Sequence, residues 1–363
     1  MRISLVMGDF ATWGGGIDFI RYIASCLAAA DPHGMHHKQL ILPKEDARSH
    51  ARQVLQALQK FSSDMKAGQK LRLPERKGFP PAYFQQTFAG FSGDFQLSAA
   101  PLRPRAMLAC AEAFRPDVLV PCLAPPVGWT RPWVGYFPDF QHRHLSQFFT
   151  ETQCRERDET ARAMLHAARH VIVNAHAVAN DARTFLGEFP AKVHVLPFSP
   201  CPQKEWLEDG ADARGQYGID RPYFLICNQF WKHKDHATAF KAFAAFAGGR
   251  QDLQLVCTGA TDDHRFPEYF GEMQALLKTL GIENQVRILG HVPKIDQIRL
   301  LKQSAAVVQP TLFEGGPGGG AAYDAIAYGR PLILSDIPVN REVTTGGVTW
   351  FPPGNHAALA QAM

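Results

Sequence analysis

Two successive series of short, almost entirely apolar segments constrain the fold of this 363-residue chain most strongly. Segments of this kind, separated by helical patterns, are typical of parallel strands that are covered on both faces. The expected strands of the first series are RISLVM, KQLILP, DVLVP, WVGYFP, HVIVNA and VHVLP, and those of the second are YFLICN, LQLVCTG, QVRILG, AVVQP, PLILS and VTWF. We therefore predict an α/β protein with two doubly wound, Rossmann-like domains that face each other across a ligand-binding cleft.

The segment between the two series sets the expected domain limits. Residues 198–221 are rich in proline, glycine and charge, which predicts a linker with one short helix. The first domain is then expected over 1–197 and the second over 222–363. Residues 61–97 follow neither pattern, and we interpret them as an acceptor-binding excursion or as an irregular packed insertion.

Composition and charge narrow the class of protein. The seven cysteines are scattered without metal-ligand spacing, which is typical of reduced thiols in a cytosolic protein. No apolar run has the length of a membrane span, and the N-terminal segment MRISLVMGDF predicts a strand instead of a secretory signal. The net charge of +4 gives no argument for nucleic-acid binding, and it permits loose attachment to an anionic membrane face without requiring it.

The segment TLFEGGPGGGAAYDAIAYGRPLILSDIPVNREV, at 311–343, carries the most chemistry. Glycines before a helix let backbone N–H groups approach a phosphate, and the helix N-terminus adds partial positive charge. Glu314 and Asp324 flank these glycines, and carboxylates can hold sugar hydroxyls. We expect Asp324 to open the helix that follows, where an acid also stabilises the helix dipole. The combination favours a nucleotide-sugar over a bare nucleotide.

Two further segments follow expected strands. Gly14, Gly15 and Gly16 come after the first strand and open a helix, so their amides would face a diphosphate, although a tight turn has the same pattern. The spacing is not GxGxxG, which argues against a dinucleotide oxidoreductase. In NQFWKHKDH, Lys232 and Lys234 stand just before a helix, where a lysine can pair with a diphosphate or simply form a solvated basic turn.

PDFQHRHL, at 138–145, leaves a strand of the first series. Asp139 and His142 are candidate catalytic residues that would form hydrogen bonds in the cleft, with a purely structural role as the alternative. Two histidines on a loop without a third partner are poor evidence for a metal site, so we expect no metal.

Taken together, these segments resemble the GT-B glycosyltransferases, and within them the retaining family 4, over nearly the whole chain. The resemblance is strongest over 223–343, in NQFWKHKDH, LVCTG, VRILGHVP, LFEGGPGGG, DAIAYGRPLILSDIP and NREV. NQFWKHK and PDFQH look most like the mannosyltransferase-like branch of bacterial polysaccharide assembly. The first domain would then be the acceptor side, and the second would bind the nucleotide-sugar.

The resemblance implies roles for single residues. Lys234 would bind the donor diphosphate and Glu314 the hydroxyls of the donor sugar. Asp324 would take the ribose, and the backbone near Val292 would meet the base. The remaining donor contacts would come from Asn228, Gln229, Lys232 and, through backbone N–H groups, Gly316, Gly318 and Gly319.

This sequence departs from the family's pattern at several positions. Nine residues separate Glu314 from Asp324, so the glycine loop is longer than usual, and the second acid is Asp. Gln229 replaces the usual phosphate-binding arginine. Pro138 stands where a cleft histidine is frequent, with His142 as the expected substitute. The sequence ends at Met363 in a helix-like pattern, so we expect either that it is truncated or that the usual final helix, which crosses back to the first domain, is missing.

We therefore expect a metal-independent, retaining hexosyltransferase without a resident cofactor. Its donor would be GDP- or UDP-linked, its acceptor a glycan or lipid-linked hydroxyl, and its location cytoplasmic, with peripheral contact at the inner membrane face permitted. A nucleotide-sugar epimerase, a phosphorylase and a non-catalytic nucleotide-sugar-binding protein of the same fold stay open as alternatives.

Overall fold

The computed structural model describes residues 1–12, 14–45, 79–199 and 201–363, which form two compact units. The first unit contains Met1–Phe137, Ala163–Ile172 and Pro190–Lys192, and the second contains Pro138–Arg162, Val173–Phe189 and Val193–Met363. Each unit contains residues from more than one stretch of the sequence. The domain limits that we expect from the strand series stay a prediction.

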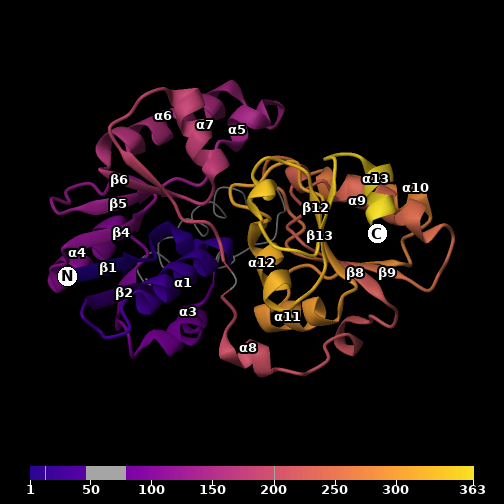
Figure 1. Ribbon diagram of the computed structural model, residues 1–363, viewed down its shortest axis with the longest axis horizontal. Coiled ribbons are helices and arrows are strands. Elements are labelled where there is room, and N and C mark those ends of the chain that lie inside the picture. Colours follow the sequence, from indigo (N-terminus) through magenta and orange to yellow (C-terminus); the bar gives the residue numbers. More distant parts are fainter. Residues whose placement is uncertain (13, 46–78, 200) are drawn as a thin grey trace, which may run out of the picture. The chain divides into compact units, whose positions relative to one another are not determined.

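The first sheet has the strand order β3-β2-β1-β4-β5-β6-β7 in the described residues (Figure 1). The strands are β1 Arg2–Val6, β2 His37–Lys44, β3 Gln96–Pro101, β4 Val118–Cys122, β5 Trp133–Tyr136, β6 His170–Val173 and β7 Lys192–Val195. The pairings from β3 across to β6 are parallel. The order reverses between β1 and β4, which is the doubly wound arrangement.

The helices that connect these strands are α1 Gly14–Ala29, α3 Pro81–Phe88, α4 Pro104–Phe114, α5 Gln141–His144, α6 Glu151–Ala167 and α7 His176–Leu186. Short 3-10 turns accompany them at η1 Gly8–Thr12, η3 Ala89–Phe91 and η4 Ser146–Phe148. The helix that the glycines after the first strand are expected to open is present as α1, which begins at Gly14.

The second sheet has the order β10-β9-β8-β11-β12-β13, and all its pairings are parallel. Its strands are β8 Tyr223–Cys227, β9 Gln254–Thr258, β10 Val286–Ile288, β11 Ala306–Gln309, β12 Leu332–Ser335 and β13 Val348–Phe351. Its helices are α8 Lys204–Glu208, α9 His236–Ala247, α10 Tyr269–Leu280, α11 Lys294–Gln303, α12 Gly319–Ala327 and α13 His356–Ala362, with 3-10 turns η5 Gly215–Tyr217, η6 Lys232–Lys234 and η7 Asn340–Glu342.

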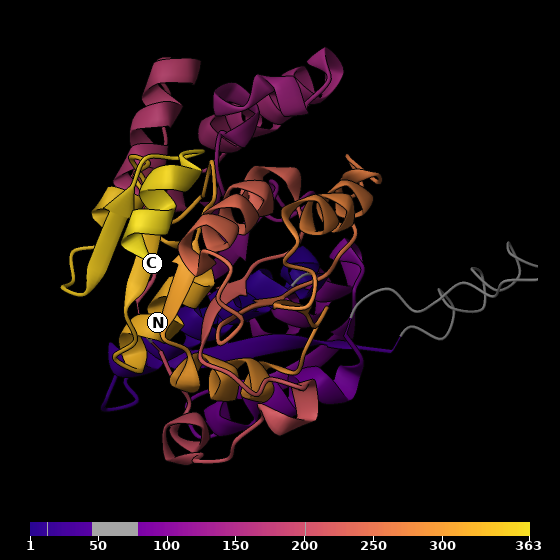
Figure 2. The ribbon, with the colours of Figure 1, turned by 90° about the vertical axis from the view of Figure 1, so that its right-hand side faces the viewer.

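Both faces of the second sheet are covered, which explains why its strands are apolar at nearly every position. Phe224 and Ile226 of β8 pack into one core with Phe240 and Phe243 of α9. Leu225, between them, belongs to the opposite core, formed with α11 and α12. On the first face, α10 and α13 both pack against α9 (Figures 1 and 2). The expected doubly wound α/β architecture is thus confirmed.

The edge strand β3 is absent from the sequence prediction. Only Ala100 of β3 is buried, and Leu97 is 37% exposed, so the strand lacks the apolar pattern that identifies its neighbours. Its register is fixed by polar contacts as well: Gln39 Nε2 donates to Ser98 Oγ at 3.0 Å. Of the segment 61–97, residues 61–78 lie outside the described residues, whereas α3, η3 and the start of β3 occupy the remainder.

A carboxylate near the end of the sequence stabilises the start of α7 in the second unit. Glu342 accepts hydrogen bonds from the backbone N–H groups of His176, at 2.8 Å, and Ala177, at 2.7 Å. These are the first N–H groups of the helix and have no partner within it. A negative charge there also complements the helix dipole.

Within the described residues, no helix has both the length and the apolar character that a membrane span requires.

Candidate functional site

The site is built around the point where the strand order of the second sheet reverses. β8 and β11 are neighbours there, and the chain leaves them in opposite directions, toward β9 and toward β12. Crevices at such points, beyond the carboxyl ends of the strands, bind ligands in open α/β sheets. Lys234 follows β8 and Glu314 follows β11, so the topology brings these two residues to the same place.

Lys234 and Glu314 form a buried ion pair. Lys234 Nζ lies 2.5 Å from Glu314 Oε1, and each side chain is only 10% exposed. Their segments are joined through the backbone as well, because Leu312 N donates to the carbonyl of His233 at 2.8 Å. The structure thus brings together the two residues to which the sequence analysis gives the main catalytic roles.

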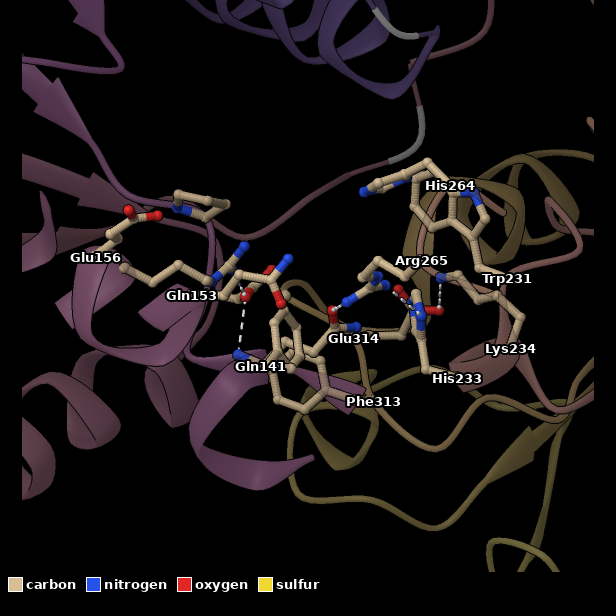
Figure 3. Close-up of a pocket in the computed structure, with 15 residues that line it drawn as sticks. Gln141, Gln153, Glu156, Trp231, His233, Lys234, His264, Arg265, Phe313 and Glu314 are labelled. Carbon is tan, nitrogen blue, oxygen red and sulfur yellow. Dashed lines mark hydrogen bonds and ion pairs between the residues drawn. The ribbon is translucent and has the colours of Figure 1, made fainter. Parts of the chain in front are cut away.

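A pocket of about 500 Å³ contains this pair, and all of its lining residues belong to the second unit (Figure 3). One group of lining residues follows β5 of the first sheet: Pro138, Asp139, Gln141, Phe149, Gln153, Glu156 and Arg157. The other group follows strands of the second sheet: Trp231, His233, Lys234, His264, Arg265, Phe313, Glu314 and Gly315.

His233 contributes a neutral ring to the pocket. Burial lowers the pKa of His233 to about 2, and the neighbouring charges of Lys234 and Arg265 act in the same direction. The ring is therefore uncharged at neutral pH. The positive charges of the pocket come from Lys234, Arg157 and Arg265.

The glycine loop after Glu314 is held by side chains from neighbouring segments. Gly318 has a φ of 65° and donates its N–H to Asn340 Oδ1 at 2.9 Å, while Gly319 donates to the carbonyl of Gly316 at 3.2 Å. Two of the three N–H groups expected to face a donor thus have protein acceptors in this structure. Gly316 packs closely, since a Cβ on it would lie 2.4 Å from Cε2 of Phe198.

Asn228 is linked to this loop through Gln309. Its Nδ2 donates to Gln309 Oε1, and Gln309 Nε2 donates to the carbonyl of Gly318 at 2.9 Å. Asn228 is only 5% exposed and does not line the pocket. The adjacent Gln229 is partly exposed, and it too is outside the pocket lining.

Asp324 does not open its helix, contrary to the sequence prediction. α12 begins at Gly319, so Asp324 is the sixth residue of the helix, where it accepts a hydrogen bond of 2.6 Å from Lys294 Nζ. The glycines before Asp324 were expected to form a loop, but Gly319 and Gly320 belong to the first turn of the helix. Neither Asp324 nor the buried Val292 lines the pocket.

Lys232 does not line the pocket, unlike Lys234. Its ammonium lies 4.6 Å from the centroid of the Phe266 ring and 5.9 Å from that of Phe148, which are cation–π distances. Its backbone N donates to Asp263 Oδ2 at 3.0 Å. The structure therefore brings one lysine of the KHK segment into the pocket and directs the other to an aromatic pair.

Asp139 lines the pocket, whereas His142 lies behind it. His142 has no exposed surface, its Nε2 lies 2.8 Å from Asp158 Oδ1, and its Nδ1 accepts a hydrogen bond of 3.1 Å from Arg157 Nε. Because Arg157 always donates, Nδ1 carries no proton and Nε2–H faces Asp158. Burial lowers the pKa of His142, which is consistent with this neutral form. Arg157 in turn donates from Nη2 to Asp139 Oδ1 at 2.9 Å.

Gly14, Gly15 and Gly16 form the first turn of α1 and belong to the first unit. This is the position after β1 that the sequence analysis expects. Their contact with a diphosphate stays a prediction.

The sequence analysis missed two pocket arginines, Arg157 and Arg265. Arg265 follows β9, the neighbour of β8, so it could have been found from the rule that residues after adjacent parallel strands meet at one edge of the sheet. Arg157 belongs to α6, and none of the motifs in the sequence analysis includes it.

Comparison with known proteins supports a relation to sugar-transferring enzymes. Residues 211–363 match the family model of the glycosyl transferases group 1. The O-antigen chain mannosyltransferase RfbU of Salmonella typhimurium is 30% identical over 142 residues, which are 39% of this chain and 37% of that protein. The D-rhamnosyltransferase WbpZ of Pseudomonas aeruginosa is 35% identical over 97 residues, a quarter of each chain. The aligned parts thus span less than two fifths of either relative's length.

Solved structures support the fold over the full chain. Sucrose-phosphate synthase from Thermosynechococcus elongatus aligns with a TM-score of 0.64 at 17% identity, and HepE from Anabaena, in complex with UDP and glucose, with 0.60 at 15%. WaaG, a glycosyltransferase involved in lipopolysaccharide biosynthesis, gives 0.56 at 16%. Each alignment covers all of this chain and 88%, 88% and 91% of the other. The expected resemblance is confirmed at this level: the chain has the GT-B fold, and its residues 211–363 match the model of the glycosyl transferases group 1.

Proposed function

We propose that this chain is a retaining glycosyltransferase that moves a hexose, of mannose type, from a nucleoside diphosphate sugar to a hydroxyl of a glycan or lipid-linked acceptor in polysaccharide synthesis. The observation that carries the proposal is the buried Lys234–Glu314 pair at the strand-order reversal of the second sheet. The match of residues 211–363 to the glycosyl transferases group 1 and the partial similarity to RfbU and WbpZ support the same class of reaction.

The ion pair suits a ligand that combines hydroxyls with a diphosphate. A lysine ammonium has three donors, so Lys234 can keep its bond to Glu314 and also donate to a phosphate oxygen. Glu314 uses one oxygen for Lys234, and its other oxygen can accept a hydrogen bond from a sugar hydroxyl. A preorganised, largely buried charge of this kind stabilises the developing charge of a leaving diphosphate.

The transfer that we propose breaks the bond between the anomeric carbon and the phosphate oxygen and forms a bond from that carbon to the acceptor oxygen on the same face. The acceptor's proton passes to the departing phosphate oxygen. The leaving group therefore serves as the base, and the protein's part is to position the reactants, to stabilise the diphosphate and to exclude water. No metal takes part in this scheme.

Turnover by single variants tests the site. Lys234→Ala and Glu314→Ala should each lower kcat/KM at least about a hundredfold, because each removes one preorganised group. Lys204→Ala is the matched control, since Lys204 forms an exposed pair with Glu208, with side chains 80% and 68% exposed. Near-wild-type kinetics in both pocket variants would refute the assignment.

The donor class can be found by thermal shift with GDP, UDP, ADP and their sugars. A ligand present at 100 times its dissociation constant should add about 2.7 kcal/mol of stability. A donor that is bound but never transferred to any acceptor would support the non-catalytic alternative. Release of an isomerised sugar without an acceptor would support an epimerase.

A further inference from the structure

Arg265 differs from the other two cations of the pocket in its partners. Lys234 is paired with Glu314, and Arg157 is paired with Asp139 at 2.9 Å. Within the part of the chain that the structure describes, Arg265 forms no ion pair with a carboxylate. It contacts neutral groups instead: its Nη1 donates to Gln141 Oε1 at 3.2 Å, and its Nη2 lies 3.5 Å from His233 Nδ1.

The surroundings of Arg265 are unfavourable for a positive charge without an anion. Its Nε is buried and has no hydrogen-bond partner among the described residues. Burial lowers the pKa of Arg265, and the positive charge of Arg157 acts in the same direction, whereas the carboxylates of Asp263 and Asp139 offset part of the effect. Arg265 as a whole is partly buried, so its charge is only partly hydrated, and an anion that enters the pocket would offset that loss of hydration.

Arg157 approaches the same place from the other group of lining residues. The guanidinium carbons of Arg265 and Arg157 lie 4.7 and 5.4 Å from the centroid of one ring, that of Phe149. Hydrogen bonds to His142 and Asp139 fix the Arg157 side chain. Two guanidinium groups are therefore held against one aromatic ring, within a pocket whose Asp139 and Glu314 carboxylates are already engaged.

We propose that Arg265, with Arg157 beside it, binds a phosphate group of the substrate in this pocket. The guanidinium fork matches phosphate oxygens in geometry and stays charged at any physiological pH. The inference rests on the proposed function, because that substrate class supplies the phosphate. Two sources have this chemistry: the diphosphate of the donor, and a phosphate carried by a lipid-linked acceptor.

Calorimetric titration of the full chain tests the proposal. The variants are Arg265→Ala, Arg265→Lys and the control Arg250→Ala. Arg250 also lies over an aromatic ring, 5.4 Å from the centroid of Phe246, but outside the pocket. The probes are inorganic pyrophosphate, GDP and UDP, with guanosine and uridine as phosphate-free ligands.

If the donor is the source, Arg265→Ala lowers the affinity for pyrophosphate and for the nucleotide that binds by about tenfold to a hundredfold, the loss expected for a hydrogen bond to a charged group. Nucleoside binding and the control stay unchanged. Arg265→Lys recovers part of the loss, because it keeps the charge without the fork. If the acceptor is the source, nucleotide affinity is unchanged and KM rises only for acceptors that carry phosphate.

The proposal is overturned if a folded Arg265→Ala variant changes neither quantity, or if it weakens nucleoside and nucleotide binding equally. A different result would refute the proposed transferase function and leave the phosphate site intact. A protein that binds pyrophosphate through Arg265, yet transfers no sugar from any nucleotide donor, would retain the phosphate site and lose the transferase assignment.

Discussion

The Lys234–Glu314 pair predicts a stability effect as well as a catalytic one. At 2.5 Å and an effective dielectric constant of about 20, the two charges attract each other by about 7 kcal/mol, and most of this offsets the loss of their hydration. Removing one partner leaves the other charge buried and alone, at a cost of about 3–5 kcal/mol. Lys234→Met and Glu314→Gln should therefore each destabilise the fold strongly.

The double variant Lys234→Met, Glu314→Gln should be more stable than the sum of the single effects by about 2–3 kcal/mol, because neither charge is left alone. Urea unfolding followed by tryptophan fluorescence measures this, and Trp231 in the pocket contributes to the signal. The exposed Lys204–Glu208 pair is the control, with an expected coupling below about 1 kcal/mol. Turnover should stay low in the double variant. Additive single effects, each below about 1 kcal/mol, would refute the reasoning.

Three further outcomes are expected. Gly316→Ala should lower the free energy of unfolding by about 1–3 kcal/mol, because its Cβ would lie 2.4 Å from the Phe198 ring. The control Gly320→Ala should be nearly neutral, because its Cβ would have no atom within 4 Å. Equal urea midpoints for the two variants would contradict this prediction. Burial lowers the pKa of His236 in the folded chain to about 3. Below about pH 6.5 the unfolded chain therefore binds a proton at this position that the folded chain does not bind. The free energy of unfolding should fall as the pH drops from 6.5 toward 3. Between pH 6.5 and pH 5 this group should account for about 2 kcal/mol, and His236→Phe, whose ring can still stack on Phe230, should lack that share of the pH dependence. Activity should survive treatment with EDTA, and a loss that a divalent cation restores would refute the metal-independent scheme.

The strands were predictable where both faces of a sheet are covered. β8 and β9 are buried at nearly every position, so their sequences are apolar throughout and unmistakable. β3 was not predictable in this way, because an edge strand with one buried residue carries no such pattern. Its pairing with β2 involves a contact between Gln39 and Ser98, which are distant in the sequence.

The sequence could predict which residues lie at the ends of strands, but it could not predict which of their side chains are buried by other segments. The sequence indicated that Lys234 and Glu314 each follow a strand of the second series, and the structure shows that these two strands are neighbours, which brings the two residues together. His142 has the residue type of a catalytic group, yet α6 supplies Asp158 and Arg157, which enclose it. The start of α12 was missed because a run of glycines indicates a loop, whereas the left-handed Gly318, bonded to Asn340, starts a helix there.

The capping of α7 by Glu342 restricts which segments can be exchanged between this protein and a relative to make a chimeric protein. An exchange of 211–363 alone, the range of the family match, would transfer Glu342 without the start of α7, whose N–H groups donate to it. It would also unite a foreign Arg265 with the resident Gln141 and Phe149. A functional hybrid should therefore carry 138–162, 173–189 and 193–363 from the same parent.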